Sequence, residues 1–398
     1  MAKSKYLRLP VNKLQVGLKV KLPLSWTEHP FLFNRVALDS EAQIEMIKNL
    51  GVPYVYVVSG AELLEDSEPE VDVVPTPSKT ASPQQAALRQ ARKALRHSQN
   101  QFIDAMNQSR TLMGKLVSDP EGAVREAALL VEMMLEQLYA SEQPRLALVS
   151  SGENRTSITQ HGISVATLAL VMGHHLDLEK TLLRAIATGA ILHDVGKMRV
   201  PEDIRTKRSG LSASEKNFLA MHPNFGYDLL KKSGMFSDDV LNIVLHHHEF
   251  FDGSGYPDGL KGDKIALPIQ LVSLANDFDS QLWRDDIISP QIALGHLFKN
   301  RAGMHQQTLI QTLVKVLEIY PPGTIVQLSD GAVAKVMLTT SETTKPQVWS
   351  CTVDGADAEY RFLMDEDVVV EAAIKPSDLS HGASKTLQAE DGISFYIC

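Results

Sequence analysis

The middle of the chain is dominated by apolar residues at helical spacing. Counted from His161, apolar side chains recur four, seven, eight and eleven positions later, which predicts an amphipathic helix with His161 on its buried face. These positions are Val165, Leu168, Ala169 and Met172. Two further apolar runs, residues 182–192 and 240–245, predict helices that lead directly into histidines. We therefore expect a mostly helical central domain, residues 146–320.

The N-terminal part of the chain has strand-like patterns instead. Residues 14–22 alternate in part between apolar and polar side chains, and residues 52–58 are rich in β-branched and aromatic side chains. Between them, residues 41–48 have helical spacing after candidate N-cap residues. These patterns predict a small α+β domain at residues 1–60.

The C-terminal part of the chain is also strand-like. Residues 323–328 and 332–338 flank a Ser-Asp-Gly sequence at 329–331, which predicts a hairpin with its turn. Further strands are expected at 348–353 and 367–370. We assign residues 321–398 to a short β-rich tail.

Two connecting segments separate the N-terminal domain from the central helices. Residues 61–83 are acidic and rich in proline, which predicts a semi-stiff linker. Residues 84–145 are rich in Ala, Leu, Gln, Arg and Met and predict a helical connector. Leu88, Leu95 and Phe102 recur there at intervals of seven. This spacing suits either a homodimeric coiled coil or a helix that docks on its own chain.

Composition narrows the class of protein. The 398 residues are 44% hydrophobic and 22% charged, as in a soluble globular protein. Asp and Glu number 48 against 39 Lys and Arg, which argues against a protein that binds duplex nucleic acid. No apolar run is long enough for a membrane span, and the first residues lack the apolar core of a signal peptide. Two cysteines cannot build a disulfide framework, so we expect a cytoplasmic protein.

The histidines between residues 161 and 248 form the candidate functional site. Each of the predicted apolar helices begins or ends at one of them, so we expect their side chains to converge. The set is His161, His193 with the neighbouring Asp194, His222, and His247 with His248. Several imidazoles with one carboxylate suit Mn, Fe, Co, Ni or Zn better than Mg or Ca.

A vicinal His-Asp pair allows a binuclear metal site. The carboxylate of Asp194 can bridge two ions while His193 binds one of them, and two ions about 3.5–4 Å apart suit in-line attack on a phosphodiester. Lys197 follows Asp194 by three residues, so its ammonium group can hold a phosphate oxygen.

These motifs resemble those of the HD-GYP family, bacterial phosphodiesterases of the HD superfamily that hydrolyse cyclic di-GMP. The resemblance extends over about residues 158–321. It is carried by His-Asp-Val-Gly-Lys at 193–197, by His222-Pro223, and by His-His-Glu-Phe-Phe-Asp-Gly-Ser-Gly-Tyr-Pro at 247–257. Residues 14–20 and 26–33 also resemble a small domain of unknown role that often precedes HD-GYP domains.

The resemblance implies a role for each residue of the set. The metal ligands would be His161, His193, Asp194, His222, His247 and His248, with Asn276 at the last ligand position. They would hold two divalent ions, manganese or iron, bridged by Asp194. Asp194 and Lys197 would be the catalytic groups. Lys197, Tyr256 and Arg284 would bind cyclic di-GMP, which is opened to pGpG, with or without a further step to GMP.

Two departures from the family pattern concern the metals. Some family members carry a glutamate that recruits a third ion where this chain has Ser157, so we expect a two-metal site. Asn276 stands where the family has an aspartate, and its neutral amide is a weaker ligand. Asp277 is next to it but would point about 100° away on a helix.

A third departure concerns the substrate. The family has a basic stretch where this chain has residues 280–289, which contain only Arg284 and two acids, Asp285 and Asp286. Acidic groups beside an anionic dinucleotide oppose binding.

Three functional hypotheses therefore remain open at this stage. The leading one is a cyclic di-GMP phosphodiesterase with a mainly α fold, in which the helical HD-type domain lies between the α+β domain and the β-rich tail. The second is a catalytically degenerate domain that serves as a cyclic di-GMP receptor or as a scaffold for diguanylate cyclase (GGDEF) proteins. The third is an HD-type phosphohydrolase that acts on another nucleotide.

Overall fold

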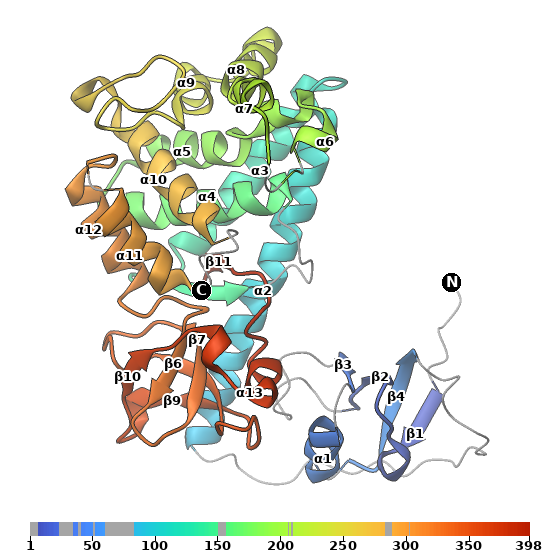
Figure 1. Ribbon diagram of the computed structural model, residues 1–398. Coiled ribbons are helices and arrows are strands. Elements are labelled where there is room, and N and C mark those ends of the chain that lie inside the picture. The colour runs from blue at the N-terminus through green and yellow to red at the C-terminus, as the bar shows by residue number, and fades with distance from the viewer. Residues whose placement is uncertain are drawn as a thin grey trace. The chain divides into compact units, whose positions relative to one another are not determined.

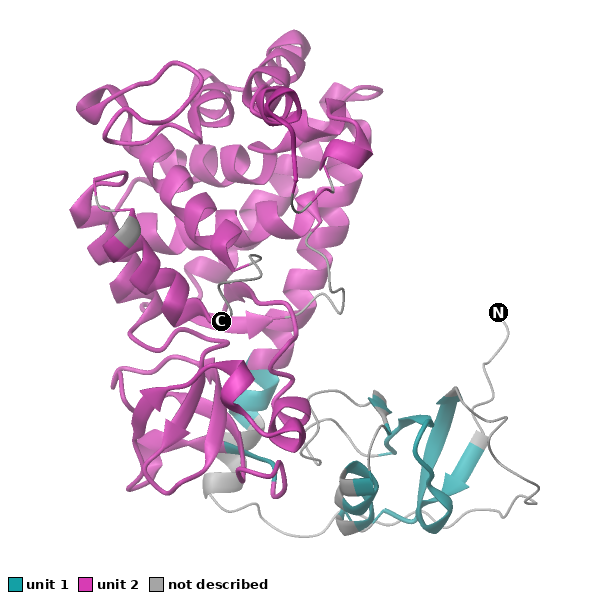
Figure 2. Cartoon of the chain, in the orientation of Figure 1, with its two compact units in different colours: residues 1–94, 358–360 teal, residues 95–357, 361–398 magenta. Residues whose placement is uncertain are grey.

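The computed structural model describes most of the chain. The described residues are 7–23, 35–38, 41–50, 52–59, 83–149, 157–205, 207, 210–282, 289–301 and 303–398. The chain divides into two compact units, residues 1–94 with 358–360, and residues 95–357 with 361–398 (Figure 2). Residues 61–82 of the predicted linker and the predicted substrate residue Arg284 lie outside the described residues.

The first unit contains the predicted α+β domain. Its strands are β1 (Leu7–Pro10), β2 (Lys19–Lys21), β3 (Arg35–Ala37) and β4 (Tyr54–Ser59), and its helix is α1 (Glu41–Asn49). The strands form an antiparallel sheet in the order β1-β4-β2-β3. Val20, Val55, Ile44 and Ile47 are fully buried between the sheet and the helix. The mixed pattern of this segment therefore gave the correct fold class.

The second unit is mainly helical (Figure 1). Its helices are α2 (Pro83–Lys115, which begins in the first unit), α3 (Pro120–Leu138), α4 (Ile158–His175), α5 (Lys180–Leu192), α6 (Glu202–Arg205), α7 (Ala213–Leu219), α8 (His222–Ser233), α9 (Asp238–His246), α10 (Leu267–Gln281), α11 (Pro290–Asn300), α12 (Gln307–Leu317) and α13 (His381–Thr386). None of the helices in the described part of the chain is long and apolar enough to cross a membrane.

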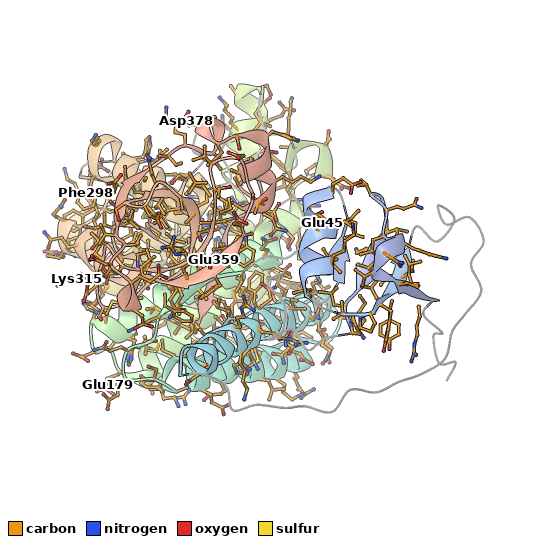
Figure 3. All side chains as sticks on the ribbon, turned by 90° about the horizontal axis from the view of Figure 1, so that it is seen from below. Glu45, Glu179, Phe298, Lys315, Glu359 and Asp378 are labelled. Atoms are coloured by element: carbon orange, nitrogen blue, oxygen red, sulfur yellow. The ribbon has the colours of Figure 1, made fainter. Side chains whose placement is uncertain are left out.

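Helix α4 lies at the centre of this unit. It contacts α3, α5, α10 and α12, and almost all of its residues are buried. The sequence pattern predicted one buried face, but α4 is enclosed on every side, and its buried residues include polar ones such as Gln160 and Ser164. Charged side chains such as Glu179, Lys315 and Asp378 are exposed (Figure 3). The mainly α fold expected for this domain is confirmed.

The β-rich tail forms a sheet that also includes a strand from before the helices. The strands are β5 (Leu146–Val149), β6 (Ile325–Leu328), β7 (Val333–Leu338), β8 (Gln347–Cys351), β9 (Glu359–Phe362), β10 (Val370–Ala373) and β11 (Ser394–Ile397). The order β10-β6-β7-β5-β11 inserts β5 between the predicted hairpin and the C-terminal strand. The β6–β7 hairpin was predictable from its local pattern, whereas β9, β11 and the pairing of β5 were not predicted, because long-range pairing has no local signal.

The C-terminal strand covers the regular apolar face of α2. The Phe102 ring packs against the Tyr396 ring at a centroid distance of 5.9 Å, and Ser98 Oγ donates a hydrogen bond of 2.8 Å to the carbonyl oxygen of Ile397. Leu95 is also buried. These contacts support the second alternative for the seven-residue spacing, a helix that docks on its own chain.

Candidate metal centre

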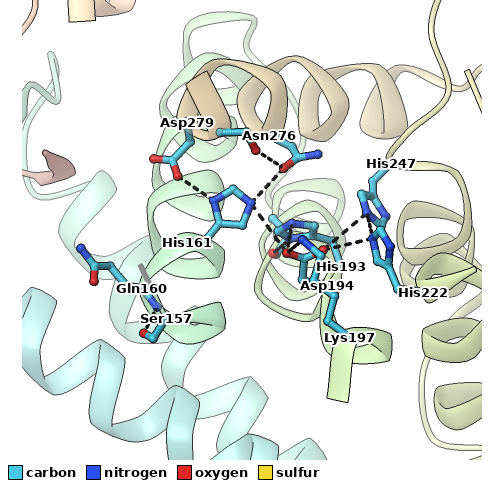
Figure 4. Close-up of polar contacts among 12 residues, drawn as sticks. Ser157, Gln160, His161, His193, Asp194, Lys197, His222, His247, Asn276 and Asp279 are labelled. Carbon is cyan, nitrogen blue, oxygen red and sulfur yellow. Dashed lines mark hydrogen bonds and ion pairs between the residues drawn. The ribbon is translucent and has the colours of Figure 1, made fainter. Parts of the chain in front are cut away.

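Five helical segments bring the predicted ligands together (Figure 4). His161 lies in the first turn of α4, His193-Asp194 follows α5, His222 begins α8, His247-His248 follows α9, and Asn276 lies on α10. The ligand atoms form two groups that share Asp194, and within each group they lie within 4.8 Å of one another. One group is Asp194, His222, His247 and His248, and the other is His161, His193 and Asp194.

Backbone carbonyls orient three of these histidines. The Nδ1 atoms of His193, His222 and His247 lie 2.7–2.8 Å from the carbonyl oxygen three residues earlier, on Ala190, Leu219 and Val244 respectively. Each carbonyl belongs to the last turn of a helix, where backbone acceptors have no partner within the helix. A carbonyl oxygen can only accept, so each Nδ1 carries the proton.

This tautomer leaves unprotonated Nε2 atoms that face one another. The Nε2 atoms of His222 and His247 are 3.1 Å apart, and His193 Nε2 has no hydrogen-bond partner among the described residues. Burial lowers the pKa of His193 to about 3 and, together with the neighbouring histidines, lowers the pKa of His247 far below its usual value. The rings of His193 and His247 therefore stay neutral, each with a lone pair on Nε2. The arrangement fits a divalent transition-metal ion, for which neutral imidazoles are preferred ligands.

Asp194 lies between the two groups. Its Oδ1 is 3.2 Å from His222 Nε2 and 3.8 Å from His247 Nε2, whereas its Oδ2 is 3.5 Å from His193 Nε2 and accepts a 2.6 Å hydrogen bond from Lys197 Nζ. Burial alone would raise the pKa of this carboxyl, but Lys197 and the adjacent histidines hold it well below its usual range. Asp194 is therefore an ionised carboxylate with one oxygen toward each group, as a bridging ligand requires.

His161 is oriented by a carboxylate instead of a carbonyl. Its Nδ1 lies 2.6 Å from Asp279 Oδ2, and its Nε2 lies 2.9 Å from Asn276 Oδ1 and 3.8 Å from Asp194 Oδ2. Burial opposes protonation of His161, but the hydrogen bond and charge of Asp279 raise its pKa. Asp279 was given no role in the sequence analysis. Its signal is the spacing of three from Asn276, which places both side chains on one face of α10.

A glycine allows the close approach of the Asp194 segment to α8. A Cβ atom on Gly196 would lie 1.9 Å from the carbonyl oxygen of His222 and 2.5 Å from the amide nitrogen of Gly226. Both atoms belong to the backbone and cannot move aside. Only glycine therefore lets the turn that carries Asp194 and Lys197 pack directly against the start of α8.

Tyr256 lies on a loop that a buried carboxylate organises. Glu249 is 1% exposed, and its oxygens accept hydrogen bonds of 2.7–3.0 Å from three backbone N–H groups, those of Asp258, Gly259 and Leu260. The Tyr256 ring stacks on the His248 ring at 4.6 Å and 16°. Glu249 was also given no role in the sequence analysis, because a single glutamate after His248 does not reveal that N–H groups nine to eleven residues later donate to it.

The remaining predicted positions have other surroundings. Ser157 caps α4, since its Oγ accepts a hydrogen bond from the Gln160 amide. Asp277 pairs with His305 at 2.9 Å, away from His161. His246 is the last residue of α9, and its Nε2 lies 3.0 Å from Asp258 Oδ2.

Comparison with known proteins identifies the domains. Residues 6–127 match a domain of unknown function, DUF3391, and residues 132–303 match the HD domain. The chain thus contains a region similar to DUF3391 followed by a region similar to the HD domain. Its resemblance to the HD-GYP family, expected from the motifs, is confirmed.

Individual relatives are similar over different lengths. Cyclic di-GMP phosphodiesterase PA4108 of Pseudomonas aeruginosa is 26% identical over 345 residues, which cover 83% of this chain and 81% of that protein. Cyclic di-GMP phosphodiesterase response regulator RpfG of Xanthomonas campestris is 34% identical over 157 residues, 37% of this chain and 40% of that protein. Among solved structures, the HDG"Y"P protein Bd1817 of Bdellovibrio bacteriovorus covers 79% of this chain, with 17% identity and a TM-score of 0.46.

Proposed function

We propose that this protein hydrolyses cyclic di-GMP to pGpG with two divalent ions, manganese or iron, held around Asp194. The observation that carries the proposal is the set of inward-facing Nε2 atoms on both sides of one ionised carboxylate. Relatives named as cyclic di-GMP phosphodiesterases support the substrate. When bound, two such ions activate water and neutralise phosphate charge.

The protein's own side chains then position the substrate. Lys197, which donates to Asp194 Oδ2 at 2.6 Å, is the cation nearest the bridging carboxylate and is the group proposed to hold a phosphate oxygen. Tyr256 presents a ring that is stacked on His248, and burial raises its pKa, so it remains a neutral donor beside the phosphates or the guanine. Arg284 stays a predicted substrate residue.

We further propose that the two ions bind with unequal affinity. The group of His222, His247, His248 and Asp194 offers three imidazoles and a carboxylate. The other group has two imidazoles and the shared carboxylate, and its next neighbour is the amide of Asn276. A neutral amide oxygen is a weaker ligand than a carboxylate, so the His161 group should fill last.

Asn276 also favours the second candidate function. If the His161 group stays empty at cellular metal concentrations, the domain binds cyclic di-GMP without hydrolysing it and acts as a receptor or as a scaffold for diguanylate cyclases. The test is a turnover assay on the purified protein loaded separately with Mn²⁺ and, anaerobically, with Fe²⁺. Chromatography resolves cyclic di-GMP, pGpG and GMP.

The proposal expects pGpG from the wild-type protein and none from a His193→Ala/Asp194→Ala double variant. Nucleotide binding without product, whether one ion or two are bound, would support the receptor instead. Hydrolysis of other nucleotides but not of cyclic di-GMP would support a different phosphohydrolase.

A further inference from the structure

Helix α10 carries a second group of polar side chains that does not face the metal centre. Asp277 Oδ2 accepts a hydrogen bond of 2.9 Å from His305 Nε2, and Arg301 Nη2 lies 3.5 Å from Asp277 Oδ1. Asp277 and His305 are both buried, at 8% and 6% exposure. A buried carboxylate and a buried histidine are costly to desolvate unless they are paired. Neither side chain reaches the ligand atoms, so the pair needs another explanation.

On its other side, His305 contacts the start of the loop that carries Tyr256. The His305 and Phe250 rings meet edge to face at 5.4 Å, and the Phe251 N–H donates a 2.8 Å hydrogen bond to the Met304 carbonyl. Arg301 lies over the Phe250 ring at 6.0 Å. The short segment before α12 therefore connects Asp277 on α10 with the two phenylalanines that follow Glu249.

These phenylalanines form the base of the Tyr256 loop, residues 249–262. The carbonyl of Phe250 accepts a hydrogen bond from the Gly253 N–H, and the carbonyl of Phe251 accepts one from the Gly262 N–H. A second anchor joins the loop to α10 directly, because Ser273 Oγ donates to the Glu249 carbonyl at 2.9 Å.

Side chains do not fill all the space beside these polar contacts. A cavity of about 10 Å³, roughly the volume that one water molecule needs, is lined by Phe251, Ser273, Met304 and His305 among others. Ser273 and Asp277 are four residues apart and thus lie on one face of α10. They anchor the loop at two points one helical turn apart.

We propose that Asp277, through His305 and Arg301, is a positioning residue that holds the Tyr256 loop in its substrate-binding arrangement. The role for substrate binding rests on the proposed function, whereas the effect on the loop does not. Asn276 and Asp279 direct one face of α10 to the metal centre, and Asp277 and Ser273 direct another to the substrate loop. Helix α10 thereby sets the distance between the metal centre and the Tyr256 loop.

The test uses full-length protein with Asp277→Ala, His305→Phe and the double variant. His305→Phe keeps a ring against Phe250 but loses the hydrogen bond to Asp277. We expect faster hydrogen exchange of the Phe251, Gly253 and Gly262 amides and an increase in KM for cyclic di-GMP of about tenfold. The value of kcat should change less than about twofold, as expected when binding interactions alone are lost. The double variant should lose no more than either single variant, because both remove the same contact.

Two controls separate positioning from general damage. Asp277→Asn keeps an oxygen that accepts from His305, so its loop exchange and KM should remain near those of the wild type. His381→Ala removes an exposed histidine far along the chain and should change neither. The number of Mn²⁺ ions bound should be the same in all variants.

Unchanged loop exchange in both Asp277→Ala and His305→Phe would overturn the proposal, as would loss of Mn²⁺ binding in Asp277→Ala, which would place Asp277 in the metal centre. If the wild-type protein has no turnover, the proposed function fails, while the exchange measurement still decides the role of Asp277.

Discussion

At the scale of single residues, a contact at Nδ1 sets which ring nitrogen carries the proton in four of the site's histidines. Three histidines donate Nδ1–H to carbonyls at helix ends, and His161 donates to Asp279. Backbone acceptors cannot titrate, so these three rings keep the same orientation at any pH at which the helices are folded. The His161 ring depends on a side chain and is the one that a substitution can release.

Replacement of Asp279 by alanine tests this dependence. Removal of the partner of a ligating histidine typically weakens metal binding 10–100-fold, and we expect a loss of about this size for the more weakly held Mn²⁺ ion. Competition with a chelator of known affinity measures the loss without reference to activity. Asp378→Ala, at an exposed position, is the matched control. Equal affinities in Asp279→Ala and wild type would contradict the assignment.

Replacement of Asn276 by aspartate tests the unequal affinities. A carboxylate 2.9 Å from His161 Nε2 adds a charged ligand to the weaker group, so the second Mn²⁺ ion should bind about tenfold more tightly, a change of about 1.4 kcal/mol. Calorimetric titration of the metal-free protein resolves the two steps. The first, tighter step should be unchanged. A variant that tightens the first step instead would show that Asn276 belongs to the other group.

At the scale of elements, the site is built where helices end. The C-terminal turns of α5, α7 and α9 supply the carbonyls that orient His193, His222 and His247, and glycine at 196 lets the turn after α5 pack against α8. The loop after α9 then needs its own support, which Glu249 provides through three backbone N–H groups. The geometry of the site thus depends on a few polar contacts between elements.

A Glu249→Gln variant tests the support of the loop. The amide can still accept at one oxygen, but its NH₂ group cannot accept from the Leu260 N–H, and one unsatisfied buried N–H costs about 1–3 kcal/mol. We expect a decrease of this size in the free energy of unfolding by urea and faster exchange of the Leu260 amide. Glu371→Gln, on the exposed side of β10, should change neither quantity. A fully stable Glu249→Gln variant would contradict the role given to this carboxylate.

The elements also show what the sequence could and could not predict. The helices and the histidine cluster were predictable because the apolar runs are long and end at the histidines, and helical geometry alone turned Asp277 away from Asn276. The roles of Asp279 and Glu249 were not predicted, because their hydrogen-bond partners are not neighbours in the sequence. The pairing of β5 with β11 was not predicted for the same reason, since the apolar pattern of Leu146–Val149 does not indicate which strand it pairs with.

At the scale of the whole second unit, the C-terminal strand unites the sheet with the helices. β11 pairs with β5 and contacts α4, Gln160 Nε2 donates to Ser394 Oγ at 3.0 Å, and the Phe395 ring stacks on the Phe278 ring of α10. The tail is therefore part of the same folded core as the helices that carry His161 and Asn276. Homodimer formation and binding to diguanylate cyclases stay predictions.

The stability of this unit should depend on pH through a lysine buried in β7. Lys335 is 5% exposed and donates to the Gln388 carbonyl, and burial lowers its pKa from 10.5 to about 8. Between these two values the unfolded chain binds more protons than the folded one, so this group makes the unfolding free energy rise with pH. Below pH 8 Lys335 is charged in the folded protein as well, and the burial of this charge lowers the free energy of unfolding by its full amount.

A Lys335→Met variant isolates this effect, because other groups titrate equally in both proteins. As the pH rises from 7 to 10, Lys335 of the folded wild type loses its buried charge, and the wild type becomes more stable. The free energy of unfolding of the variant, relative to that of the wild type, should therefore fall by about 2–3 kcal/mol over this range. Urea unfolding at each pH measures it. Lys375→Met, at an exposed position, should give a constant difference. A constant difference for Lys335→Met as well would contradict the assignment.

Hydrolysis should require ions in both groups around Asp194. The most direct measurement is a titration of metal-free protein with Mn²⁺ in which bound metal and pGpG formation are followed in the same samples. We expect little product at one ion per chain and a rise in rate as the second ion binds, with the rise shifted to lower Mn²⁺ in Asn276→Asp. Two bound ions with no pGpG from either protein, or pGpG from metal-free protein, would contradict this requirement.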